Sequence, residues 1–228
     1  MSRINVIFCG YRDWANTIFK SVEKHKNINV KKIITTYDEY KDFELHPITD
    51  VDLVLFIGWS WIIPDNFTNS HVCIGIHPSD LPQYRGGSPL QNQIINGISN
   101  SKISLITLSS KLDAGEIWLK EDLSLIGDSM NEIFDNIILS SIRLLNTFFN
   151  SYPKLKPELQ DLSKGSYFKR RKPEESKLNL NQLNNMSLLE LYNFIRCLTD
   201  PYPNAYLEDK EGNKLLFKNV TYIPVKKI

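Results

Sequence analysis

The sequence has no excess of charge of either sign, and this narrows its class before any motif is considered. Its 27 lysine and arginine residues face 26 aspartate and glutamate residues, which leaves a formal net charge of +1. Proteins that bind a large nucleic acid usually carry a basic excess, because contacts with phosphates supply most of the affinity. The balance therefore favours small-molecule partners over nucleic acid and leaves room only for a local basic patch.

Cysteine and long apolar runs are also scarce. Cys9, Cys73 and Cys197 are an odd number without metal-ligand spacing, so they predict buried, reduced thiols in a cytosolic protein and no metal site. The apolar stretch at 4–9 is too short for a signal peptide, and the longest apolar run, 51–64, is interrupted by polar residues and glycine. We therefore expect a cytoplasmic protein without a membrane partner.

The order of the apolar segments predicts an α/β fold. Runs rich in β-forming residues at 3–9, 29–35, 52–57 and 72–76 are separated by short helical segments. This is the pattern of a doubly wound, mostly parallel sheet of Rossmann-like type. No Gly-x-Gly-x-x-Gly follows the first run, so a bound dinucleotide is not indicated.

Two more strands and two helices complete the main part of the predicted fold. The runs 102–108 and 117–123 predict strands on either side of a loop at 109–116. Residues 88–97 predict a helix with a proline in its first turn, and 130–149 predicts a long amphipathic helix.

The composition changes after residue 152. Residues 153–177 are rich in Pro, Lys, Ser and Glu and are interpreted as a connection. A helix is predicted at 187–198, and a hairpin at 205–207 and 215–220.

These features divide the chain into a main domain and a small tail. The predicted main domain spans 1–165, and 166–228 forms a linker with a small helix-plus-hairpin unit. A hairpin of this kind leaves strand edges that need cover, so we expect a homodimer built partly from 180–228.

The densest group of chemically unusual residues is the run 77–87, His-Pro-Ser-Asp-Leu-Pro-Gln-Tyr-Arg-Gly-Gly. It directly follows a predicted strand, and ligands of open parallel sheets bind beyond the carboxyl ends of the strands. Asp113 stands in the later loop between two strands. A carboxylate that meets a histidine orients the imidazole and suits the pair to proton transfer. Taken singly, His77 is more often structural and Asp113 is usually a turn residue.

Together these segments resemble the folate-dependent formyltransferase family. The resemblance lies in His-Pro-Ser-x-Leu-Pro-x-Tyr-Arg-Gly at 77–86 and Asp-x-Gly-x-Ile at 113–117, in this order around a helix and a strand. Gly-Trp-Ser-Trp-Ile-Ile-Pro at 58–64 is similar to the segment that lines the pterin pocket of the family. The resemblance implies the formyltransferase fold over about residues 1–165. It also implies 10-formyltetrahydrofolate, a reduced folate, as the donor and attack of a neutral amine on the formyl carbon.

The resemblance also implies roles for single residues. His77 would stabilise the oxyanion or transfer a proton, and Asp113 would fix the protonation state of His77 and relay the proton. The pterin would be flanked by Asp113, Trp59, Trp61, Ile62 and Ile63. A plain apolar core is the other interpretation of this segment.

Gly75 departs from the family pattern, which usually has an asparagine two residues before the histidine. Losing such a donor to the formyl oxygen typically costs about 100- to 1000-fold in rate. Asn92 and Gln93 are candidate replacements, as is an ordered water in the space left by Gly75. The alternatives are a formyltetrahydrofolate hydrolase or a catalytically inert folate or sugar-nucleotide binder.

The tail bears on the identity of the amine. Residues 192–206 look like the sugar N-formyltransferase pattern, in which an Ile-Arg helix leads into Asp-Pro-aromatic-Pro. Only 25 residues follow Pro203, too few for the RNA-binding domain expected of a methionyl-tRNA formyltransferase. The resemblance therefore favours a nucleotide-linked amino sugar, such as a dTDP-linked 4-amino- or 3-amino-dideoxyhexose for a lipopolysaccharide O-antigen, over another small amine. The candidate contacts to this substrate are Tyr84, Arg85, Gln93, Arg171 and Tyr202.

Overall fold

The computed structural model describes residues 3–225. A six-stranded sheet forms its centre, in the order β2-β1-β3-β4-β6-β7. The strands are β1 Ile4–Cys9, β2 Ile28–Ile34, β3 Leu53–Phe56, β4 Cys73–His77, β6 Asn100–Thr107 and β7 Ile117–Ser124. The first four strands are parallel, and β6 runs antiparallel to both β4 and β7. The predicted α/β fold with a mostly parallel sheet is confirmed, and the six predicted strands of the main sheet are present.

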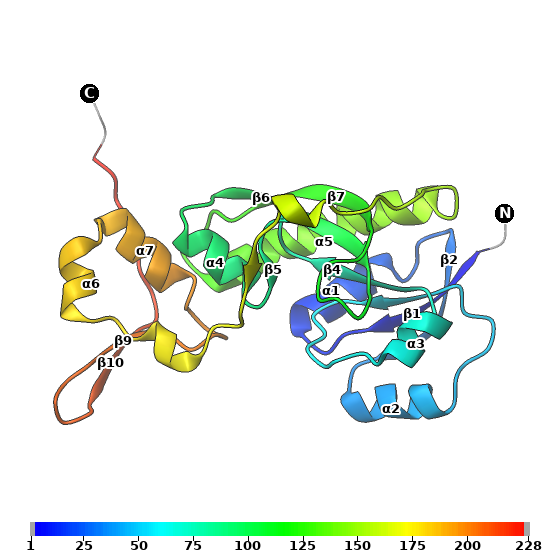
Figure 1. The fold of residues 1–228 in the computed structure, drawn as a ribbon, viewed down its shortest axis with the longest axis horizontal. Helices are drawn as coiled ribbons and strands as arrows, with labels where there is room; N and C mark the ends of the chain where they lie inside the picture. Colours follow the sequence, from blue (N-terminus) through cyan, green and yellow to red (C-terminus); the bar gives the residue numbers. More distant parts are fainter. Residues whose placement is uncertain (1–2, 226–228) are drawn as a thin grey trace.

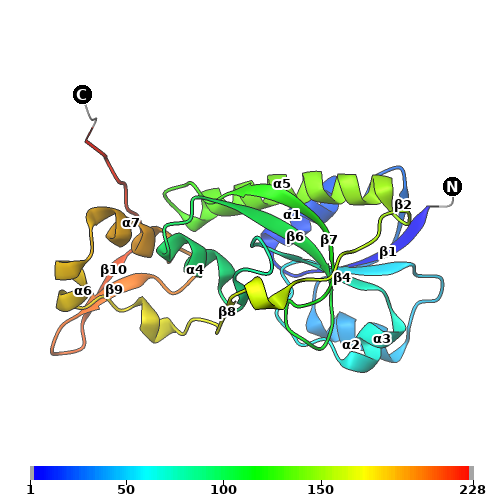
Figure 2. The ribbon, with the colours of Figure 1, turned by 45° about the horizontal axis from the view of Figure 1, so that its top comes forward.

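Helices cover both faces of this sheet (Figures 1 and 2). One face carries α1 Asp13–Val22 and α5 Met130–Ser151, and the other carries α2 Tyr37–Leu45 and α3 Asp65–Ser70. Within β1, Val6 and Phe8 belong to the core under α1 and α5, whereas Ile7 and Cys9 belong to the core under α2 and α3. Successive residues of a strand point to opposite faces, so a strand covered on both sides is apolar throughout.

Helix α2 is absent from the prediction because its apolar stripe is thin. It buries only Tyr40 and Phe43. Its start is fixed by a capping box, in which the Thr36 hydroxyl accepts from the Glu39 N–H at 3.2 Å and the Glu39 carboxylate accepts from the Thr36 N–H at 3.2 Å. The same carboxylate accepts from the Thr35 N–H at 2.7 Å, and this bond is the main reason that the pKa of Glu39 is lowered. At the start of this helix, hydrogen bonds supply the stabilisation that buried apolar side chains supply in the other helices.

A second group of elements lies at the end of the sheet away from the N-terminus (Figure 1). It contains α4 Pro89–Ile95, α6 Leu180–Asn185, α7 Leu188–Arg196, the strands β9 Ala205–Glu208 and β10 Lys214–Phe217, and a 3-10 turn at Pro173–Ser176. Another 3-10 turn, Leu162–Lys164, contacts the loop after β4, where the Gln83 amide donates to the Lys164 carbonyl. The predicted helix at 187–198 and the antiparallel C-terminal hairpin are confirmed. Helix α6 was not predicted, and none of its residues is buried.

The segment predicted as a connection, 153–177, is more ordered than its composition indicates. It contains β8 Tyr167–Phe168, which pairs in parallel with β5 Arg85–Gly86. The Arg85 N–H donates to the Ser166 carbonyl at 3.0 Å, and the Gly87 N–H donates to the Phe168 carbonyl at 2.8 Å. The connection therefore runs along the loop that follows β4. The domain boundary at 165–166 stays a prediction.

Arg196 fixes α7 to the main sheet. Its buried guanidinium donates to Asn193 Oδ1 at 2.8 Å, to the Leu125 carbonyl at 2.7 Å and to the Gly127 carbonyl at 3.0 Å. Burial lowers the pKa of Arg196. The arginine of the Ile-Arg pattern in the tail is thus an internal anchor between α7 and the turn before α5.

Other features bear on the chemistry that the fold offers. Cys9, Cys73 and Cys197 are buried and unpaired, and burial raises the pKa of Cys73 and of Cys197 to about 12. Such thiols stay protonated near neutral pH and are poor nucleophiles. Between residues 3 and 225, no group of three or more His, Cys, Asp or Glu is placed to hold a metal ion. No helix in this range has the length and apolar content needed to cross a bilayer.

Candidate active site

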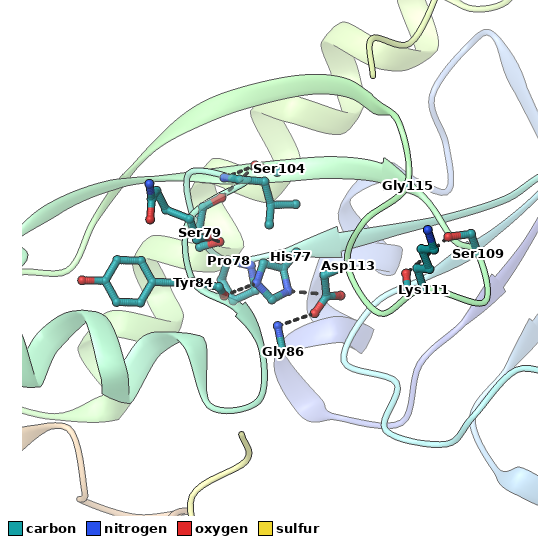
Figure 3. Close-up of polar contacts among 12 residues, drawn as sticks. His77, Pro78, Ser79, Tyr84, Gly86, Ser104, Ser109, Lys111, Asp113 and Gly115 are labelled. Atoms are coloured by element: carbon teal, nitrogen blue, oxygen red, sulfur yellow. Dashed lines mark hydrogen bonds and ion pairs between the residues drawn. The ribbon is translucent and has the colours of Figure 1, made fainter. Parts of the chain in front are cut away.

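His77 is the last residue of β4 and is buried. Its Nε2 lies 2.9 Å from the Tyr84 carbonyl oxygen, and its Nδ1 lies 3.5 Å from Asp113 Oδ1 (Figure 3). Each ring nitrogen therefore faces an oxygen. The structure brings the two predicted catalytic residues together, and their catalytic roles stay predictions.

Asp113 is held from several sides in the loop between β6 and β7. Its backbone has a φ of 51°, in the left-handed region. Its Oδ2 accepts from the Gly86 N–H at 2.8 Å. The Gln160 side-chain amide donates to the carbonyls of Asp113 and Gly115 at 3.0 and 2.7 Å. No local pattern points to Gln160, because this contact joins residues 47 positions apart.

Gly115 lets the same loop approach the end of β6. A Cβ at this position would lie 1.8 Å from the Thr107 carbonyl oxygen. No side chain fits at that distance, and the neighbour is backbone that a rotamer change cannot move. Gly115 therefore sets how closely the Asp113 loop packs on the sheet.

The loop after His77 is rigid and in contact with another part of the chain. The Ser79 hydroxyl donates to the Gln83 carbonyl, and the Ser104 hydroxyl donates to the Ser79 carbonyl, both at 2.7 Å. At Gly87, a Cβ would lie 2.3 Å from the backbone of Arg170. Gly87 thus makes room for the segment after β8.

The place of the missing asparagine is filled by a neighbour. A Cβ at Gly75 would lie 2.8 Å from Leu108 Cδ2, so the leucine side chain occupies the space beside the strand. The ordered water in this space stays a prediction, and Leu108 takes part of the room that it would need.

The two candidate replacement amides are engaged within the chain. The Gln93 amide nitrogen donates to the carbonyls of Pro78 and Pro89 at 2.8 and 2.9 Å, and Gln93 Oε1 accepts from the Ser101 hydroxyl. Both N–H groups of Gln93 are therefore used, which leaves none for a formyl oxygen or a substrate. The Asn92 amide donates to the Gly87 carbonyl at 3.1 Å. Its catalytic role stays a prediction.

Comparison with known proteins agrees with this geometry. The sequence matches the formyl transferase family over residues 12–138, a range that includes β4, the His77 loop and Asp113. The chain belongs to the formyl transferase family. A methionyl-tRNA formyltransferase of Malacoplasma penetrans (strain HF-2) is 30% identical over 220 residues, which cover 90% of this chain and 64% of that protein.

Solved structures share the fold of this formyl transferase. A methionyl-tRNA formyltransferase from Clostridium thermocellum is 31% identical, with a TM-score of 0.75 over 93% of this chain and 96% of that one. A sugar N-formyltransferase from Shewanella sp. FDAARGOS_354 is 18% identical, with a TM-score of 0.77 over 97% of this chain and 99% of that one. Among the first curated relatives, the matched part spans only 26% to 64% of the relative's own length.

The segment predicted to line the pterin pocket follows β3 in this formyl transferase. Trp59 packs against the core under α2 and α3, and its indole nitrogen is buried without a hydrogen-bond partner. Ile63 packs against the same core, whereas Ile62 is 89% exposed. Trp61 is partly exposed, and its ring centroid lies 4.5 Å from that of Tyr11. The pterin contacts of these residues stay predictions.

Two of the predicted substrate contacts are engaged elsewhere. The Tyr84 ring stacks on Phe168 at a centroid distance of 5.1 Å, and its hydroxyl accepts from the Asn96 amide at 3.2 Å. The Arg171 side chain donates to the Glu175 carbonyl at 2.6 Å. These contacts hold the chain together and leave less of each side chain for a ligand.

Arg85 and Tyr202 have fewer partners. The Nε of Arg85 is buried without a hydrogen-bond partner. Tyr202 lies beside Phe134, and burial raises the pKa of its hydroxyl. Both remain candidates for substrate contacts in this formyl transferase.

Proposed function

We propose that this chain transfers the formyl group of 10-formyltetrahydrofolate to a primary amine. The observation that carries the proposal is the buried pair of His77 and Asp113 at the carboxyl end of β4, with Nδ1 and Oδ1 3.5 Å apart, in a member of the formyl transferase family. A buried imidazole held by a carboxylate is suited to donate to a developing oxyanion and to pass a proton.

In the proposed reaction the amine nitrogen attacks the formyl carbon and forms the new C–N bond. The bond from the formyl carbon to N10 of the folate breaks, and N10 takes up the proton that the amine loses. His77 Nε2, which contacts the Tyr84 carbonyl in this structure, turns to donate to the oxyanion of the tetrahedral intermediate, and Asp113 keeps the imidazole oriented through Nδ1. Leu108 beside Gly75 supplies no donor, so His77 carries a larger share of the oxyanion stabilisation in this chain.

We propose a nucleotide-linked amino sugar as the acceptor, of the dTDP-4-amino-4,6-dideoxyglucose type used for O-antigen. The near-zero net charge and the Asp-Pro-Tyr-Pro segment at 200–203 support this choice. A methionyl-tRNA is the second candidate, favoured by the 30% identity to the Malacoplasma penetrans enzyme over 90% of this chain. We place the reaction in the cytoplasm, where unpaired cysteines such as these stay reduced.

The test is a formyl-transfer assay with 10-formyltetrahydrofolate, read by mass spectrometry. The acceptors are dTDP- and UDP-linked 3-amino and 4-amino sugars and methionyl-tRNA. We expect one sugar to gain a formyl group, and His77→Ala to slow transfer about 100-fold or more. Formylation of methionyl-tRNA alone would replace the sugar by the second candidate. Formate release without an acceptor would identify a hydrolase, and folate binding without any turnover would identify an inert binder.

The proposed homodimer involves the C-terminal hairpin. In the described chain β10 pairs only with β9, so its other edge is open. Leu215 and Leu216 on this strand are 62% and 51% exposed. An open apolar edge is stabilised by pairing with a second copy. Light scattering should give twice the chain mass, reduced to the chain mass by Leu215→Glu. A monomeric wild-type protein would refute the dimer.

A further inference from the structure

Tyr84 has an uncommon backbone conformation, and its carbonyl faces His77. The φ of Tyr84 is 56°, in the left-handed region, where the Cβ of any residue other than glycine is crowded. Within residues 3–225, four non-glycine residues have a positive φ. Two of them, Tyr84 and Asp113, supply the oxygens that face the ring nitrogens of His77 (Figure 3). A backbone conformation that costs free energy persists only where other contacts hold it.

The contacts that hold Tyr84 come from the segment around β8. The Ser166 hydroxyl accepts from the Tyr84 N–H at 2.8 Å, and the Ser166 carbonyl accepts from the next N–H, that of Arg85, at 3.0 Å. The Phe168 ring stacks on the Tyr84 ring, with the centroids 5.1 Å apart and an angle of 7° between the planes. One serine thus binds two successive N–H groups on the two sides of the Tyr84 carbonyl carbon, and the orientation of this carbonyl is fixed.

The segment 84–87 also contacts the other partner of His77. The Gly86 N–H donates to Asp113 Oδ2 at 2.8 Å. The other three N–H groups of this segment donate to acceptors in 166–168. The positions of both oxygens that face His77 therefore depend on how 166–168 holds this segment.

The Tyr84 carbonyl determines where His77 carries a proton. A carbonyl oxygen only accepts hydrogen bonds, so Nε2 of His77, 2.9 Å away, must bear an N–H. Nδ1 lies 3.5 Å from Asp113 Oδ1, which is longer than an ordinary N–H···O bond of about 2.7–3.2 Å. The shorter contact is therefore the one to Tyr84, and it keeps on Nε2 the proton that an oxyanion would accept.

We propose that Ser166 is a positioning residue for His77. Its hydroxyl holds Tyr84 in the left-handed conformation, and the Tyr84 carbonyl then accepts from Nε2–H until the oxyanion of the reaction takes its place. The effect on turnover rests on the proposed function, since it takes Nε2 to donate to that oxyanion. The effect on the location of the proton does not.

The location of the proton is tested by nitrogen-15 NMR of the imidazole rings in the full chain, labelled at histidine. The chain has four histidines, and His77→Gln identifies the signals of His77. In the wild type, Nε2 of His77 should have the chemical shift of a protonated nitrogen. In Ser166→Ala, this signal should move toward the shift of an unprotonated nitrogen, because the Tyr84 carbonyl is no longer held against the ring.

Two matched variants isolate the Ser166 hydroxyl. Ser166→Thr keeps a hydroxyl and should keep the wild-type signal. Ser163→Ala removes a hydroxyl from the same connection, one that donates to Asp161, and should leave His77 unchanged. If Ser166→Ala does not fold by circular dichroism, Ser166→Val takes its place, since valine has the shape of threonine without the hydroxyl.

Steady-state transfer measures the consequence for the reaction. In Ser166→Ala, kcat should fall about tenfold while KM for the folate and for the acceptor stays the same, and Ser166→Thr should restore kcat. An unprotonated Nε2 in the wild type, or an Nε2 signal that does not respond to Ser166→Ala, would overturn the positioning role. So would an equal loss of kcat in Ser166→Ala and Ser166→Thr.

The two measurements keep this inference separate from the proposed function. If the His77 signal responds to Ser166→Ala while the wild type transfers no formyl group to any acceptor, the proposed function fails and the positioning role stands. If the wild type is active and neither the signal nor kcat responds to Ser166→Ala, the positioning role fails and the function stands.

Discussion

Replacing Gly115 with alanine tests whether the position of the Asp113 loop limits the reaction. A Cβ at Gly115 would lie 1.8 Å from the Thr107 carbonyl oxygen, whereas a close carbon–oxygen contact is about 3.3 Å. The loop must therefore move by about 1.5 Å, because β6 is held on both sides by other strands. Asp113 is two residues away, so its carboxylate moves with the loop.

This displacement gives two expected magnitudes. A misplacement of about 1 Å in a catalytic group costs about 100-fold in rate, so kcat for formyl transfer should fall by about that factor. Forcing an extra carbon into a packed site costs about 1–3 kcal/mol, so the free energy of unfolding should fall by about 2 kcal/mol.

Gly97→Ala separates the two effects. Gly97 has a φ of 77° and no atom within 4 Å of its Cβ position. Alanine there loses about 1–2 kcal/mol through backbone strain alone. Urea unfolding and steady-state kinetics on both variants make the comparison. If Gly115→Ala keeps the kcat of the wild type, or if Gly97→Ala loses as much rate, the reasoning about loop position is refuted.

Three other substitutions test contacts described above. Gln160→Leu removes the hydrogen bonds to the carbonyls of Asp113 and Gly115, so kcat should fall about tenfold. The far-UV circular dichroism spectrum should stay unchanged. An unaltered kcat would mean that other contacts hold the Asp113 loop. Arg196→Leu leaves the carbonyls of Leu125 and Gly127 and the Asn193 amide oxygen without a donor. The free energy of unfolding, measured in urea, should fall by about 3 kcal/mol. A loss below about 1 kcal/mol would contradict the role of Arg196 as an anchor. Glu39 has a lowered pKa in the folded chain, so its stabilising effect is present above the ordinary value of 4.5 and is lost as the pH falls through the folded value. The difference in the free energy of unfolding between the wild type and Glu39→Gln should therefore shrink below pH 4.5. A difference that does not depend on pH would contradict the capping role of the carboxylate.

The central strands of the sheet could be predicted from the sequence because they are buried on both faces. A run such as Leu53–Phe56 is apolar at every position, and this signal is local. His77 and Asp113 could be predicted as neighbours because His77 ends a strand, Asp113 lies in the loop after another strand, and both belong to a recognisable motif. The bounds of helix α2 were not predicted, because its sequence signal is the Thr36–Glu39 capping box and not an apolar stripe.

Other features depend on contacts that no local pattern encodes. Leu108 fills the space beside Gly75 because β4 and β6 are neighbours, and the sequence does not say which side chain will turn into a gap. The pairing of β5 with β8 joins two-residue strands that are separated in the chain by residues 87–166.

Because β8 pairs with β5, the candidate active site is built from separate segments of the chain and not from one continuous domain. A chain cut after residue 165 would lose the Ser166 hydroxyl that accepts from the Tyr84 N–H at 2.8 Å, and the Phe168 carbonyl that accepts from the Gly87 N–H. The loop that carries the Tyr84 carbonyl would then lose its contacts on one side. The His77 ring, which contacts this carbonyl, would be held less firmly. Residues 166–168 are therefore built into the loop of the candidate active site, and the C-terminal part of the chain cannot be exchanged as a separate module.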